Sequence, residues 1–193
     1  MKFFKNKAAS VAPFAVLSCL MALDAHAVTK EVRDHTHGLN ADALIGADLI
    51  SGGPGNTSSS TSALGYGFRL GYHLNYNWEV GLSVSTSSNS TTAAGSTTSS
   101  ATTLLMAELD YHLSDGLNPL YFGFRMGAGF SSVSGNAVTA SASSNAAYGF
   151  VGGYDVYTND NFTIGPRVAY TMVPISGGNI GVFQIQAAFK YFF

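Results

Sequence analysis

Apolar and polar residues alternate along eight segments of the chain. Between residues 120 and 130, for example, Phe122, Phe124 and Met126 are separated by Gly123 and Arg125. Successive side chains of a β-strand point to opposite faces of a sheet, so a period of two predicts strands. The eight predicted strands are residues 41–51, 64–74, 78–85, 104–113, 120–130, 146–157, 162–172 and 183–193.

The two faces of these strands differ in chemistry, because one is rich in aromatic and aliphatic side chains and the other holds glycine and charged residues. A soluble barrel or sandwich would bury the aromatic face and expose the glycine-rich one. Soluble surfaces carry abundant Lys and Glu, whereas only 10% of this chain is charged. The pattern therefore favours an all-β fold, an eight-stranded antiparallel up-and-down transmembrane β-barrel over residues 41–193 with its aromatic face toward lipid.

The connections between the predicted strands alternate in length, as a transmembrane barrel with periplasmic turns and outer loops requires. The short ones are residues 75–77, 114–119 and 158–161, and the others are residues 52–62, 86–103, 131–145 and 173–179. None of the four outer connections contains a charged residue, and residues 86–103 consist only of Ser, Thr, Asn, Ala and Gly. Pro166 weakens the prediction of the strand at 162–172, because proline cannot donate a ladder hydrogen bond.

Charged residues of the predicted strands fall on the glycine-rich face, which would line the lumen. The interior of an eight-stranded barrel is just filled by side chains, and buried charges must pair. We therefore expect an ion-pair network inside the barrel, with Arg69, Glu108, Arg125 and Arg167 at similar heights. The predicted network comprises Asp48, Arg69, Glu79, Glu108, Asp110, Arg125, Asp155, Arg167 and Lys190.

Two histidines and a glutamate form a second candidate group at the periplasmic end. His73 precedes the first short turn, Glu79 follows it, and His112 ends the neighbouring strand. Such residues can bind zinc, but the plainer interpretation is a hydrogen-bonded lower end of the network. The sequence therefore leads us to expect no metal and no cofactor.

The first residues have the organisation of a secretory signal peptide. A basic start is followed by an apolar run over residues 11–23, and Ala25 and Ala27 occupy the cleavage-recognition positions. We expect residues 1–27 to be removed; a lipoprotein box ending at Cys19 is the alternative. Residues 28–40 are polar and predict a periplasmic lead-in, whose His35 and His37 are read as solvated.

The last predicted strand resembles the C-terminal signal of bacterial outer-membrane β-barrels, with Gln186, Ala188, Phe189, Tyr191 and Phe193 at the matching positions. Ala188 replaces the usual glycine. Together with eight strands and a charged lumen, the chain resembles the small barrels of the outer-membrane protein A, outer-membrane protein X and opacity-protein group. The resemblance implies an integral outer-membrane protein with a structural, surface-interaction or immune-exposure role and no catalysis. Its implied partners are outer-membrane lipids, lipopolysaccharide, periplasmic chaperones, the barrel-assembly machinery and an unidentified surface ligand, but not nucleic acid.

Two other functions remain open from the sequence. Inward glycines such as Gly123 and Gly127 leave volume for a narrow channel that passes ions or small apolar molecules. A lipid A-modifying enzyme would need a histidine near an outer serine. His73 and His112 map instead to the periplasmic end, so the residue pattern disfavours an enzyme.

Overall fold

The computed structural model describes residues 38–54, 60–75, 77–93, 96–113, 120–135, 138–141, 145–159, 161–175 and 178–193. The predicted signal peptide with Ala25 and Ala27, the Cys19 box and the pair His35 and His37 lie outside the described residues. None of the described segments is a helix of the length and hydropathy needed to cross a bilayer.

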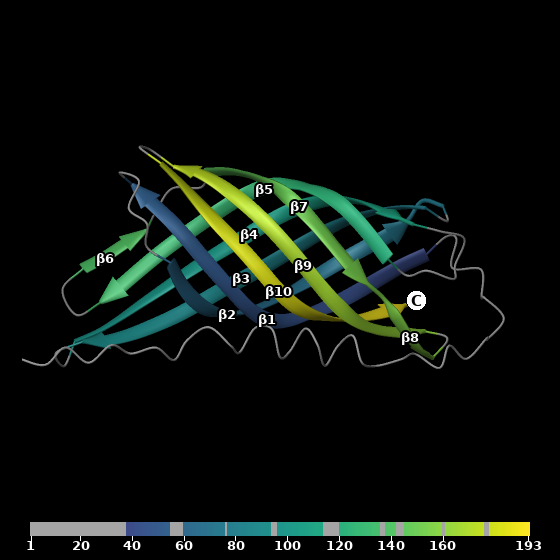
Figure 1. Cartoon of the computed structure of the whole chain (residues 1–193), viewed down its shortest axis with the longest axis horizontal. Coiled ribbons are helices and arrows are strands. Elements are labelled where there is room, and N and C mark those ends of the chain that lie inside the picture. Colours follow the sequence, from purple (N-terminus) through teal and green to yellow (C-terminus); the bar gives the residue numbers. More distant parts are fainter. Residues whose placement is uncertain are drawn as a thin grey trace, which may run out of the picture. The chain divides into compact units, whose positions relative to one another are not determined.

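The described residues form antiparallel β-strands that close into a barrel (Figure 1). The strands are β1 (Gly38–Pro54), β2 (Ser60–His73), β3 (Trp78–Ala93), β4 (Ser96–His112), β5 (Leu120–Gly135), β6 (Val138–Ser141), β7 (Asn145–Tyr154), β8 (Val156–Asn159), β9 (Phe162–Ile175) and β10 (Gly178–Phe192). β1 pairs with both β2 and β10, which leaves no free edge between the first and last strands. The predicted all-β, eight-stranded antiparallel barrel is confirmed.

β7 and β8 together make one strand of the wall. Both pair with β9 in the same register, through Gly153↔Arg167 and Val156↔Ile164, and they are separated only at Asp155. β6 is a short strand that pairs with the end of β5. Pro166 lies in β9 opposite the interruption between β7 and β8, so its missing N–H falls where the ladder is already broken.

The strands are longer than the sequence pattern predicted. β3 and β4 stay paired from Thr86↔Thr103 to Ala93↔Ser96, so most of the predicted connection over residues 86–103 extends the hairpin as strand. Both faces of this hairpin are polar beyond the apolar band, so no alternation marks the strands, although threonine favours them. β1 likewise starts at Gly38, inside the predicted lead-in, and the predicted outer connections 52–62, 131–145 and 173–179 are partly strand.

The apolar face of the wall points outward and the charged face inward. Leu82 and Phe150 are 63% and 66% exposed, whereas Arg69 and Arg167 are each 1% exposed. Inside, the half of the barrel farther from the short turns holds an apolar cluster that the sequence analysis did not predict. It comprises Leu104, Met106, Ala147, Val173 and Val182.

Candidate functional site in the barrel interior

Ten charged side chains are buried on the inner faces of the strands, each at most 4% exposed. Every strand of the wall contributes at least one of them, because the two-residue period places the charged positions of each strand on the same face. They are Asp42 and Asp48 of β1, Arg69 of β2, Glu79 of β3, Glu108 and Asp110 of β4, Arg125 of β5, Asp155 between β7 and β8, Arg167 of β9 and Lys190 of β10.

Arg69 is the centre of this group. Its Nε donates to Glu108 Oε2 at 2.8 Å, its Nη2 to Asp110 Oδ2 at 2.7 Å and its Nη1 to Asp42 Oδ2 at 3.3 Å. Nη1 also donates to Glu79. A guanidinium carries five N–H donors in a rigid fork, which lets one arginine satisfy several carboxylates.

Two glycines make room for the Arg69 side chain. Gly71 and Gly81 face each other on β2 and β3. A Cβ atom at Gly81 would lie 2.8 Å from Arg69 Nη2, and one at Gly71 would lie 2.7 Å from Nη1. Both separations are too short for a real contact, so any side chain at these positions would displace the guanidinium.

Glu108 joins Arg69 to a second arginine from across the barrel. Arg167 Nη2 donates to Glu108 Oε1 at 2.8 Å and to Oε2 at 2.7 Å. Ser83 Oγ donates to Glu108 Oε1 at 2.8 Å. β4 and β9 are not neighbours in the wall, because β5 and β7 lie between them on one side. The Arg167–Glu108 contact therefore crosses the lumen.

Arg125 and Asp48 belong to a separate hydrogen-bonded group. Arg125 Nη2 donates to Gln184 Oε1 at 3.1 Å, and Gln184 Nε2 donates to Asp48 Oδ2 at 3.1 Å. Ser87 Oγ also donates to Asp48. Within the described residues neither Arg125 nor Asp48 makes an ion pair, although Arg125 lies directly opposite Glu108 in the strand register. Gln184 thus links two charges that the sequence analysis assigned to the ion-pair network.

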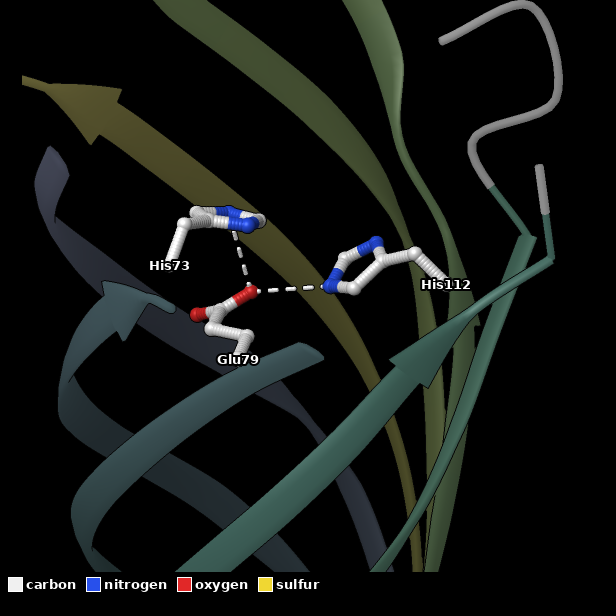
Figure 2. A group of neighbouring side chains, drawn as sticks. All are labelled: His73, Glu79 and His112. Atoms are coloured by element: carbon white, nitrogen blue, oxygen red, sulfur yellow. Dashed lines mark hydrogen bonds and ion pairs between the residues drawn. The ribbon is translucent and has the colours of Figure 1, made fainter. Parts of the chain in front are cut away.

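Glu79 connects Arg69 with the residues at the short-turn end of the barrel. Asn40 Nδ2 donates to Glu79 Oε1 at 3.1 Å, and His112 Nε2 lies 3.0 Å from Oε2, in hydrogen-bond contact. His73 Nε2 lies 3.2 Å from the same oxygen (Figure 2). Lys190 Nζ is 3.6 Å from Oε2 and donates to Asp155 Oδ2 at 2.8 Å.

Five participants were not among the predicted site residues: Asn40, Asp42, Ser83, Ser87 and Gln184. Asp42 and Asp48 are an even number of positions apart in β1 and therefore share its inner face, so the position of Asp42 could have been found from the pattern. Asn40 fell in the predicted lead-in, where no pattern marked it as buried. Gln184 lies on the polar face of the last predicted strand but, like Ser83 and Ser87, carries no charge, so nothing in the sequence singled it out.

The residues of the predicted C-terminal signal divide between the two faces of β10. Gln186 and Ala188 point inward and are 4% and 2% exposed. Tyr191 and Phe193 point outward, with ring centroids 5.2 Å apart in an edge-to-face arrangement. Phe189 lies on the same outer face and is partly exposed.

Comparison with known proteins identifies relatives by family and by fold. A family model described as an outer membrane protein beta-barrel domain matches residues 12–193. Neisserial surface protein A (NspA) has a TM-score of 0.66 at 15% identity, with 81% of this chain and 97% of that chain covered. Ail, the attachment invasion locus protein of Yersinia pestis, solved with the heparin analogue sucrose octasulfate, has a TM-score of 0.60 at 13% identity, with 80% and 99% covered. No curated protein matches the chain.

Proposed function

Because this chain belongs to the outer membrane protein β-barrel family, we propose that it is a closed scaffold of the outer membrane that presents uncharged hairpins at the cell surface. The same membership confirms the predicted outer-membrane location. The proposed role is structural or surface-interacting. It rests on ion pairs that close the lumen and on outer connections that are uncharged and rich in hydroxyl groups.

The observation that carries the proposal is the contact across the lumen between Arg167 and Glu108. This pair and Arg69 come from β9, β4 and β2, on separate parts of the wall. An ion that passed this level would have to break contacts of 2.7–2.8 Å between fully desolvated charges, which is strongly unfavourable. The apolar cluster around Leu104 and Val182 lies in the lumen farther from the short turns and supports the same proposal.

The outer connections support a surface role that does not depend on charge. The hairpin of β3 and β4 extends well past the apolar band, and its strands are linked by hydroxyl pairs such as Thr86 with Thr103, 3.1 Å apart. Exposed hydroxyls can bind a partner through hydrogen bonds or shield the surface. Lipopolysaccharide and the other outer-membrane lipids are the proposed surroundings of the apolar wall, and a surface ligand is the proposed partner of the hairpins.

Single-channel recording tests the closed scaffold. Refolded protein is incorporated into a planar bilayer, and folding is checked by heat-shifted gel mobility. We expect no conductance steps from the folded protein. Reproducible steps that change in a Glu108→Gln variant would contradict the proposal and favour the narrow channel.

The positions of the two described inner-wall histidines disfavour lipid A modification, because both lie at the short-turn end of the barrel. His73 and His112 are both adjacent to Glu79, with ring centroids 5.0 Å apart. Neither makes a hydrogen bond to a described serine, the partner that a serine hydrolase requires. Altered lipid A in cells that overproduce the protein would contradict this part of the proposal.

A further inference from the structure

The interior of the barrel holds more negative than positive charge. Of the ten buried charged side chains, six are carboxylates and four are cationic, which leaves an excess of two negative charges when histidine is neutral. A buried charge without compensation is strongly unfavourable. The described lumen therefore favours the uptake of further positive charge near its carboxylates.

Three side chains at the short-turn end have the composition and spacing of a metal site. His73 Nε2 and His112 Nε2 lie 3.2 Å and 3.0 Å from Glu79 Oε2. Each of the three residues has one potential ligand atom that lies within 4.8 Å of those of the other two. Figure 2 shows both rings directed at the carboxylate. Zinc bonds of about 2.0–2.2 Å in tetrahedral geometry place ligand atoms about 3.3–3.6 Å apart. The observed separations from Glu79 are slightly shorter than this, so a small outward shift of the rings would accommodate an ion.

One ligand atom of this group has no hydrogen bond. His73 Nε2 is buried and unpaired in the hydrogen-bond network, despite its proximity to Glu79, and His73 as a whole is 7% exposed. Buried polar nitrogens normally have partners. A metal ion between the three side chains would satisfy this nitrogen.

The local structure holds these ligands before any ion binds. His73 and Glu79 are partners in the β2–β3 register, so the short turn between them fixes their separation. Asn75 Oδ1 accepts hydrogen bonds from the amides of Asn77 and Trp78 at 2.9 Å and 3.0 Å. Asn77 Nδ2 also donates to the carbonyl of His112 at 3.0 Å, which ties the turn to the end of β4.

The second oxygen of Glu79 is already occupied. Asn40 and Arg69 both donate to Glu79 Oε1, which fixes the orientation of the carboxylate and leaves Oε2 toward the histidines. Such outer contacts typically orient metal ligands. Lys190 Nζ, 3.6 Å from Oε2, would compete with a bound cation, but its shorter contact of 2.8 Å is to Asp155.

We propose that His73, Glu79 and His112 bind one divalent transition-metal ion of the zinc class at the periplasmic end of the lumen. The ion supplies two positive charges where the carboxylates exceed the cations, and a water molecule completes the tetrahedron. The side chains of His73 and His112 are 9% and 11% exposed, compared with 1% for Glu79, so the ion enters past the two rings. The site stabilises the barrel and is independent of whether the lumen conducts.

Zinc titration of the refolded, chelator-stripped protein tests the site. We expect one zinc ion per chain, a higher urea midpoint of unfolding with zinc, and visible absorption typical of tetrahedral coordination when cobalt(II) is used as a probe. His73→Asn and His112→Asn should each weaken zinc binding at least tenfold. A folded wild-type protein without zinc uptake, or with equal uptake in both variants, would overturn the proposal.

Two controls separate this site from other sources of binding. Ser83→Ala removes a lumen hydroxyl that contacts Glu108 but none of the three ligands, so zinc binding should be retained. A His35→Ala, His37→Ala variant removes the histidines of the predicted lead-in and should also retain it. Loss of the zinc response in that double variant would assign the metal to the lead-in and overturn the lumen site. If a ligand variant fails to refold, cobalt absorption of the wild type with and without competing zinc remains decisive.

Discussion

At Arg69, one guanidinium contacts four carboxylates, contributed by β1, β3 and β4. Burying any of these charges without its partner would strongly destabilise the fold. The intact pairs therefore add little net stability, but removing one partner lowers the free energy of unfolding. Arg125 is a useful contrast. It has the same side chain and is 2% exposed, yet its described hydrogen-bond partner is the neutral Gln184.

Replacing these two arginines should therefore have unequal effects. Arg69→Met leaves four buried carboxylates without their shared cation, and we expect a loss of about 3–5 kcal/mol in the free energy of unfolding. Arg125→Met is the matched control and should cost less, because it leaves one amide oxygen and the more distant Asp48. Urea unfolding of refolded protein in lipid vesicles gives both values. Equal losses would contradict the hub role of Arg69.

The sequence predicted which of these residues share the inner face, but not which of them contact one another. The alternation identified which charged side chains share the inner face, because that depends only on the period of a strand. It could not pair Arg167 with Glu108, since contacts across a lumen depend on the stagger of strands that are not neighbours. Asn40 was missed for a different reason: glycine and asparagine at the start of β1 carry no apolar signal.

At the scale of the element, the β3–β4 hairpin shows where periodicity stops being informative. Strands within the apolar band have one lipid-facing and one lumen-facing side, which produces alternation. Beyond that band both sides are polar, and the pairing from Thr86↔Thr103 onward is carried by backbone hydrogen bonds and hydroxyl contacts such as Ser90 with Ser99, 3.0 Å apart. The low-complexity composition of residues 86–103 therefore gives no periodic signal, although most of this segment is a regular hairpin.

Hydrogen exchange tests this hairpin directly. We expect the amides of residues 86–90 and 99–103 that face the partner strand to exchange much more slowly than those of an unstructured peptide of the same sequence, because each is paired across β3 and β4. The amides of residues 80–84, inside the apolar band, are the internal reference. Exchange at the peptide rate over residues 86–103 would mean that the pairing is not maintained in solution.

At the scale of the whole molecule, the buried charged side chains lie in the lumen and not in the predicted outer connections. The outer connections contain no lysine or arginine, whereas buried arginines are committed to partners in the lumen. Polyanions are recognised through clusters of basic side chains. The predicted outer connections therefore lack the basic side chains that a sulfated ligand would need, although the fold is similar to that of Ail.

Heparin affinity measures this difference. We expect the refolded protein in detergent to pass through a heparin column without retention at physiological ionic strength, since its outer hairpins offer no cation. A Ser88→Lys, Ser90→Lys variant adds two charges on exposed positions of β3 and should gain salt-sensitive retention. Retention of the unaltered protein that salt abolishes would reveal a basic surface elsewhere.

The pairing of β1 with β10 closes the barrel, so the closed wall requires the final strand. The amide of Phe193 donates to the carbonyl of Leu39 at 3.0 Å, so the last residue of the chain pairs with one of the first in the barrel. β10 is the strand that joins β1 to β9, so without it neither of these strands has a partner on that side. A sheet that lacks β10 has two open edges, which are templates for pairing with other chains. Loss of the final strand would therefore yield an open sheet prone to aggregation, not a slightly smaller barrel.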